Sequence, residues 1–218
     1  MPKRFDLIVW DWDGTLADST GMITQAVLMA AAQVGLPAID KQTASHIIGL
    51  GLQEAIHALY GDIPVHQAQE MARLYKANYF AGEHEIALFD EAVDLIKSLH
   101  HQGFKLAVAT GKGRRGLNMA LQYAELTPYF HATRTVDECF SKPHPQMLEE
   151  LMDNLFAVPE RTLMIGDTSY DLQMAQNAGV AAIGVTFGAQ PAEKWQHLNP
   201  IQQFNDFASL SGWLLAHA

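Results

Sequence analysis

Four short apolar runs divide the chain and indicate buried β-strands. Each run ends at a polar or glycine-bearing turn, and together they cover residues 7–10, 106–109, 163–165 and 180–185. Segments with helical periodicity, such as 147–156 and 172–178, separate the last three runs. Alternation of this kind predicts an α/β fold with a Rossmann-like core, a doubly wound parallel sheet covered by helices on both faces. A weaker strand is expected within residues 130–136.

Almost 100 residues separate the first two runs, far more than one crossover helix needs. Apolar residues from Ile23 to Val34 fall on one helical face, with Asp18 or Ser19 placed to cap that helix and Gly35 to end it. Further helices are expected over residues 41–48, 52–60 and 65–80.

These helices predict an inserted domain. We expect a catalytic core made of residues 1–17 and 86–218, and an all-helical cap domain made of residues 18–85. Linkers near residues 17–19 and 82–87 would serve as a hinge, so that the helical domain can act as a lid.

Composition narrows the class of protein. The chain has 218 residues, 14 basic and 24 acidic, with a formal net charge of −10. This balance argues against partners such as nucleic acid or anionic membrane, which need basic patches. The single Cys139 cannot form an internal disulfide, and no apolar stretch is long enough to span a bilayer. We therefore expect a soluble cytoplasmic protein, either a monomer or a homodimer.

Two carboxylates follow the first predicted strand. Asp11 and Asp13 lie two positions apart and should project to the same side of the extended chain, before Gly14 and Thr15 turn it away. Like charges at this spacing need a cation or a shared proton. The pair suits a nucleophile beside an acid/base, although an Asp-x-Asp doublet by itself is common.

Two later segments offer positive or hydrogen-bonding groups. Thr110, Gly111 and Lys112 follow the second predicted strand and could hold a phosphate with a hydroxyl and backbone N–H groups. An ordinary strand-to-helix turn remains the alternative. Lys142 stands before Pro143 at a helix entrance, where its ammonium could point into a site. A surface proline-rich turn is the alternative there.

Two more carboxylates follow the strand at residues 163–165. Asp167 should emerge beside the strand that carries Asp11, and Asp171 lies one helical turn later. Mg²⁺ prefers oxygen ligands and few protein carboxylates, so these residues are candidate metal ligands, with Asp171 binding the ion or orienting its waters. The alternative for Asp167 is a helix N-cap, for which Thr168 is equally suited.

These segments, in this order, resemble the motifs of the haloacid dehalogenase superfamily of phosphotransferases. Residues 11–15 resemble its first motif, Thr110 its second, Lys142 its third and residues 166–171 its fourth. The helical insertion matches the first type of cap in that family, and within the family the chain looks most like phosphoglycolate phosphatases.

The resemblance implies a role for each motif residue. Asp11 would attack phosphorus and form an aspartyl-phosphate, and Asp13 would act as acid and then as base. The phosphoryl oxygens would be held by Thr110, Gly111, Lys112 and Lys142. Mg²⁺ would be bound by Asp11, Asp167 and the backbone carbonyl of Asp13.

Differences from related enzymes reduce the number of reactions to be considered. The dehalogenases lack the second aspartate of the first motif, which is present here as Asp13, so cleavage of a carbon–halogen bond is not expected. Phosphonatases use a lysine of the cap, and residues 44–49 contain none. β-Phosphoglucomutases place a histidine shortly after the first motif, and residues 22–24 contain none. The favoured function is a Mg²⁺-dependent phosphatase of a small phosphorylated metabolite, with 2-phosphoglycolate as the best single substrate. A sugar-phosphate mutase and a non-catalytic binding protein remain alternatives. Residues 49–52 are expected to form a substrate-facing loop, or else a simple connection between helices.

Overall fold

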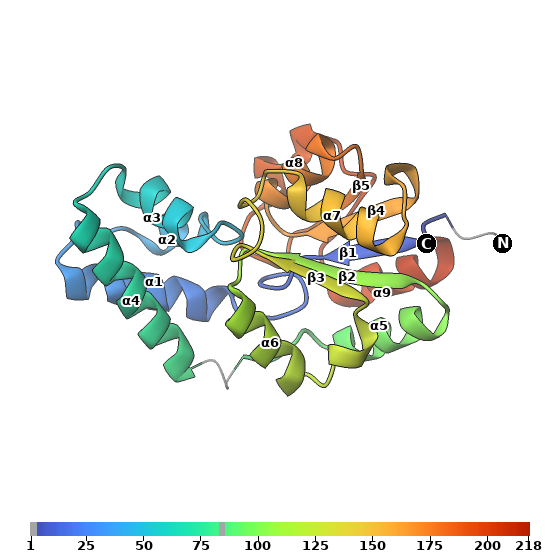
Figure 1. The fold of residues 1–218 in the computed structure, drawn as a ribbon, viewed down its shortest axis with the longest axis horizontal. Helices are drawn as coiled ribbons and strands as arrows, with labels where there is room; N and C mark the ends of the chain where they lie inside the picture. The colour runs from blue at the N-terminus through green and yellow to red at the C-terminus, as the bar shows by residue number, and fades with distance from the viewer. Residues whose placement is uncertain (1–3, 83–85) are drawn as a thin grey trace.

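The centre of the molecule is a six-stranded parallel sheet (Figure 1). The computed structural model describes residues 4–82 and 86–218. In chain order its strands are β1 (Leu7–Trp10), β2 (Lys105–Thr110), β3 (Ala132–Thr135), β4 (Thr162–Gly166), β5 (Ala181–Val185) and β6 (Gln202–Phe204). Their order across the sheet is β3-β2-β1-β4-β5-β6. The strand order reverses beside β1, and ligands of such sheets bind outside the carboxyl ends of the strands at that point.

Strand β1 is apolar along its whole length because both of its faces are covered. It pairs with β2 through Leu7 and Lys105 and with β4 through Leu7 and Thr162, and all four of its residues are buried. A strand at the middle of a parallel sheet therefore shows a continuous apolar run instead of an alternating one.

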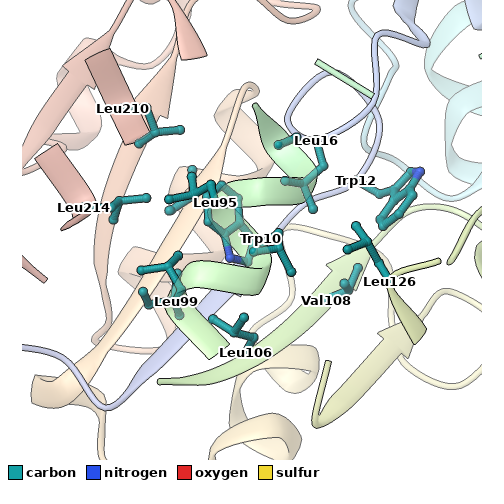
Figure 2. Packing of buried hydrophobic residues seen from close by; sticks show 14 of the residues in the cluster. Trp10, Trp12, Leu16, Leu95, Leu99, Leu106, Val108, Leu126, Leu210 and Leu214 are labelled. Atoms are coloured by element: carbon teal, nitrogen blue, oxygen red, sulfur yellow. The ribbon is translucent and has the colours of Figure 1, made fainter. Parts of the chain in front are cut away.

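One face of the sheet is covered by three helices. They are α5 (Ala92–His101), α6 (Arg114–Tyr123) and α9 (Phe207–His217). Figure 2 shows Trp10 of β1 among leucines that these helices contribute, Leu95 and Leu99 from α5 and Leu210 and Leu214 from α9.

The other face is covered by α7 (Gln146–Leu155) and α8 (Ser169–Asn177). Leu7 and Val9 of β1 belong to the apolar cluster on this side, and Trp195 packs there as well. Both faces of the sheet are thus closed to water, as a doubly wound fold requires.

Four further helices form a unit of their own at one end of the molecule (Figure 1). They are α1 (Thr20–Val34), α2 (Lys41–Ser45), α3 (Leu52–Tyr60) and α4 (Val65–Gly82). They enclose a separate apolar cluster that includes Val27, Ile56 and Met71. In the following text α1 to α4 are called the helical unit. Residue 85, the last residue of the expected cap domain, and part of the expected hinge at 82–87 lie outside the described residues, so the domain division stays a prediction.

The α/β fold expected from the apolar runs is confirmed, and several element boundaries differ from the expectation. The strand expected within residues 130–136 is present as β3. Strand β6 and helices α5 and α9 have no counterpart among the expected elements, and α2 ends at Ser45 instead of residue 48. Strand β6 has three residues, two of them exposed, so it shows no apolar run. Within the described residues, no helix combines the length and the apolar character needed to cross a membrane.

Candidate active site

Four chain segments meet where neighbouring strands end. Asp11 follows β1, Thr110 ends β2, and Asp167 follows β4. Lys142 lies between β3 and α7, and its ammonium reaches the carboxylate of Asp11. Residues more than 150 positions apart are thereby brought to one edge of the sheet, as the parallel topology requires.

Lys142 lies between two carboxylates. Its Nζ atom is 2.7 Å from Asp11 Oδ1 and 2.6 Å from Asp171 Oδ1, and all three side chains are buried. Buried charges of this kind are found in proteins when they are paired. Lys142 is thus a fixed buried cation at the centre of the site.

Burial and ion pairing shift the pKa of Asp11 in opposite directions, and the same is true of Lys142. Burial raises the pKa of Asp11 to about 7, with Asp171 adding to the rise and Lys142 opposing it. For Lys142, burial lowers the pKa, but the carboxylates of Asp11 and Asp171 outweigh that effect and raise it above the ordinary value. Lys142 therefore stays charged, and Asp11 needs a further cation to be fully ionised at neutral pH.

Asp167 is enclosed by backbone that comes very close to it. Its Oδ1 accepts a hydrogen bond from Thr15 Oγ1 at 3.2 Å, and its Oδ2 accepts one from the Ala189 N–H at 2.6 Å. A Cβ atom at Gly14 or at Gly188 would overlap this carboxylate, so glycine is required at both positions. Burial, and then Asp11 and Asp171, raise the pKa of Asp167 well above its usual value.

The carboxylate of Asp171 accepts hydrogen bonds within the first turn of α8. Its Oδ2 accepts hydrogen bonds from the backbone N–H of Thr168 at 3.1 Å and from Thr168 Oγ1 at 2.6 Å, and the first of these is one half of a capping box with Thr168. Thr168 and not Asp167 is the N-cap of this helix, so the carboxylate of Asp167 remains directed into the site.

Asp11, Asp167 and Asp171 can hold a metal ion. One oxygen from each lies within 4.8 Å of the others. Neither carboxylate oxygen of Asp11 makes a hydrogen bond of regular geometry, although both are buried. Buried carboxylates without donors are costly unless a cation compensates them, and Mg²⁺ prefers oxygen ligands of this type. Asp171 is paired with the Lys142 ammonium at Oδ1 and accepts two hydrogen bonds at Oδ2, whereas Asp167 accepts one hydrogen bond at each oxygen, from neutral donors. Asp11 and Asp167 are therefore the better direct ligands.

Asp13 does not join this cluster through its side chain. Its carboxylate accepts a hydrogen bond from Ser19 Oγ at 2.8 Å, and Lys112 Nζ lies 3.2 Å from its Oδ1. The expectation that Asp13 serves the metal therefore depends on its backbone carbonyl and stays a prediction. The two aspartates of the first motif have different surroundings, which fits different chemical roles.

The Thr110–Lys112 turn is partly engaged with the protein itself. Thr110 is buried, and its Oγ1 accepts a hydrogen bond from the Lys112 N–H at 3.1 Å. As arranged here, that N–H is bound to Thr110 instead of facing a phosphoryl group. The Lys112 ammonium contacts Asp13, and it also donates to Tyr79 Oη of α4 at 2.6 Å.

A cavity of about 650 Å³ opens over these residues, between the sheet and the helical unit. Asp11, Asp13 and Thr110 line its floor, and α1, α3 and α4 line its walls together with the loop at residues 49–52. A volume of this size is typical of a site for a small molecule. The loop expected to face a substrate does line the cavity.

The helical unit closes directly onto the core. The Gly51 N–H donates to Ser141 Oγ at 2.8 Å, and Gln190 Nε2 donates to the His46 carbonyl at 3.1 Å. A Cβ atom at Gly111 would overlap the carbonyl oxygens of Gly49 and Leu50. Backbone from the two parts of the molecule is thus in direct contact beside the site.

Sequence reasoning missed several residues that hold the site together. The sequence predicts Asp18 or Ser19 as the cap of α1; Ser19 is the N-cap residue, but its side chain makes no capping hydrogen bond and donates to Asp13. Tyr79 and Ser141 act across the boundary between the helical unit and the core, so spacing along the chain gives no sign of them. Gly188 follows β5, and its position after a strand was the one available signal.

Comparison with known proteins identifies similar chains. A family model described as haloacid dehalogenase-like hydrolase matches residues 8–185. A protein of Dickeya dadantii named "Probable phosphatase IndB" is 32% identical, over 97% of this chain and 94% of its own length. The pyrophosphatase PpaX of Anoxybacillus flavithermus is 29% identical, over 96% of this chain and 98% of its own. The phosphoglycolate phosphatase of Aliivibrio fischeri is also 29% identical, over 96% of both chains.

The fold recurs in solved structures. The crystal structure of a hydrolase from Pseudomonas syringae superposes with a TM-score of 0.89, covering 98% of this chain and all of the other. Sequence identity to it is 21%, so this likeness concerns the fold alone.

Proposed function

The chain belongs to the haloacid dehalogenase-like hydrolase family, and we propose that it is a Mg²⁺-dependent phosphatase that hydrolyses a small phosphorylated metabolite through an aspartyl-phosphate. The observation that carries the proposal is Asp11. Its buried carboxylate has no regular hydrogen bond, lies 2.7 Å from the Lys142 ammonium and borders the cavity. A carboxylate so placed is a suitable nucleophile.

In the first step an oxygen of Asp11 attacks phosphorus and the ester P–O bond breaks. Asp13 donates a proton to the departing alcohol oxygen. In the second step water attacks the aspartyl-phosphate, Asp13 accepts the proton of that water, and inorganic phosphate leaves with Asp11 regenerated. Separate surroundings for the two carboxylates support this division of roles, since Asp13 contacts Ser19 and Lys112 and not the acidic cluster.

Charge stabilisation is the main task in phosphoryl transfer. Lys142 would offset negative charge on the phosphoryl oxygens, and Thr110 and the Gly111 N–H would orient them. When bound, Mg²⁺ would be held by Asp11 and Asp167, with Asp171 fixing Lys142 beside them, and would supply further positive charge at the phosphoryl group.

The relatives supply the first substrates to test. Similar proteins are named for action on phosphoglycolate and pyrophosphate. Both compounds, with a panel of phosphorylated metabolites, should therefore be assayed for release of inorganic phosphate.

The decisive variant is Asp11→Asn. We expect hydrolysis to require Mg²⁺, to stop when the metal is chelated, and to fall by at least about a thousandfold in this variant. Wild-type rates in the Asn variant with Mg²⁺ present would disprove the nucleophilic role of Asp11. A product that retained its phosphate would instead indicate a mutase.

A further inference from the structure

We propose that the preferred substrate is a phosphate monoester whose alcohol carries an apolar ring, in contrast to a small acid that carries a carboxylate besides its phosphate. The proposal rests on the proposed phosphatase function and adds the class of leaving group. It comes from the wall of the cavity that faces Asp11 and Asp13.

That wall is largely apolar. Helix α3 lines it with Leu52, Ile56 and Leu59, and α4 lines it with Met71 and several aromatic residues. Apolar surface in a binding cavity gains free energy when it is covered by apolar ligand surface. A two-carbon acid such as glycolate has almost no apolar surface with which to cover this wall.

The aromatic side chains form a continuous group on α4. The rings of Tyr75 and Tyr79 stack at 5.9 Å with 27° between their planes, and Phe80 meets Tyr79 edge-on, also at 5.9 Å. All three line the cavity. Rings arranged in this way can pack against a flat apolar group of the ligand.

Positive charge in the cavity is poorly placed for a second anionic group. Among the described residues of the helical unit that line the cavity, the one cation is Lys76, and its side chain is exposed. In the core, Lys112 is paired with Asp13, and Arg115 lies over the Phe80 ring at 5.4 Å. The buried ammonium of Lys112 is also engaged by Tyr79, since it donates to Tyr79 Oη and lies 4.4 Å from the centroid of that ring. A substrate carboxylate against the α3 side of the wall would therefore lose its hydration without a free buried cation, among the described lining residues, to replace it.

The test compares esters that differ in the alcohol. Ethyl phosphate and 2-phenylethyl phosphate have leaving alcohols of similar basicity, so a rate difference between them reports contacts with the ring. With Mg²⁺ present, we expect kcat/KM for 2-phenylethyl phosphate to exceed the values for ethyl phosphate, 2-phosphoglycolate and pyrophosphate by at least about tenfold.

A variant locates the contact. Tyr75→Leu keeps the position apolar but removes the ring, and we expect it to lower the ratio of kcat/KM for 2-phenylethyl phosphate to that for ethyl phosphate several-fold. Tyr123→Leu is the matched control, because Tyr123 is 66% exposed on α6 and does not line the cavity. Its ratio should equal that of the wild type.

The two proposals fail in different ways. Absence of Mg²⁺-dependent hydrolysis with every ester would overturn the phosphatase function and this inference together. Hydrolysis that depends on Asp11 but is as fast with ethyl phosphate or 2-phosphoglycolate would overturn this inference alone, and so would an unchanged ratio in Tyr75→Leu.

Discussion

Lys142 shows how much a single side chain contributes to this site. Its ammonium is buried between Asp11 and Asp171, within 2.7 Å of a carboxylate oxygen of each. Each carboxylate depends on it, and its own pKa is raised because the two acids outweigh the effect of burial. Stability and chemistry are therefore coupled at this residue.

Replacing Lys142 by methionine should lower both the stability of the fold and the rate of hydrolysis. The variant leaves two buried carboxylates without their cation, so we expect the free energy of unfolding to fall by about 3–5 kcal/mol and hydrolysis to be lost. Urea unfolding followed by circular dichroism measures the first, and phosphate release the second. Lys194→Met, at an exposed position, is the control and should match the wild type. Equal stability of Lys142→Met and wild type would contradict the account.

The thiol of Cys139 is expected to react slowly with alkylating reagents. Burial, and then the nearby Glu150, raise its pKa to about 11. At pH 8 only about one thiol in a thousand is then ionised, and the thiolate is the reactive form. Alkylation by iodoacetamide, followed by mass spectrometry, should be slow in the folded protein and should accelerate about tenfold per pH unit between pH 8 and 10. Complete labelling within minutes at pH 8 would show that the thiol is not protected.

At the level of elements, the ends of helices depend on backbone conformation. Gly35 follows the last residue of α1 and caps it; its φ of 78° lies in the left-handed region, and its N–H donates to the Ala31 and Ala32 carbonyls. Glycine adopts this conformation without the steric cost that a Cβ atom brings. Gly212 lies within α9, where glycine has no such advantage.

Alanine at these two glycines should have opposite effects. A Cβ atom meets nothing within 4 Å at either position, so crowding does not enter the comparison. We expect Gly35→Ala to lower the free energy of unfolding by about 1 kcal/mol, since φ is positive there. Gly212→Ala should raise it by up to about 1 kcal/mol through helix propensity. Thermal unfolding of the pair measures both changes, and a shift of the same sign in both would refute the argument.

For the whole molecule, contact between the helical unit and the core shapes the site. Gly111 lies against the carbonyl oxygens of Gly49 and Leu50, and the Gly51 N–H binds Ser141. Asp13 contacts Lys112, which Tyr79 of α4 also contacts. The closed arrangement of the helical unit thus bears directly on the residues proposed to act on the substrate.

Gly111→Ala tests whether this closed arrangement matters. The added methyl group would force the two parts apart, so we expect kcat/KM to fall by about 10- to 100-fold while the free energy of unfolding changes little. Ser141→Ala removes one hydrogen bond across the same boundary without adding bulk, and we expect a loss of less than tenfold. Steady-state kinetics and urea unfolding of both variants give the comparison. A Gly111→Ala enzyme with wild-type kinetics would show that closure onto Gly49 is not needed.

Local patterns were sufficient for the central strands and for the residues at their ends. The apolar runs predicted β1, β2, β4 and β5, because strands covered on both faces lack polar positions. The strand ends identified Asp11, Thr110 and Asp167, because parallel strands present their carboxyl ends at one edge of the sheet. Strand β6 was missed because it is short and largely exposed.

The sequence by itself determined the fold class, and it predicted the helical insertion and the candidate residues at the strand ends. Each follows from interactions between residues close in the chain or from the geometry of a parallel sheet. Only the tertiary structure decided how those residues pair. Lys142 lies between Asp11 and Asp171, the Ser19 hydroxyl binds Asp13 and not the backbone of α1, and Tyr79 contacts Lys112 from the helical unit. These contacts join residues from separate elements, and the distance between such elements depends on how they pack and not on their spacing in the sequence.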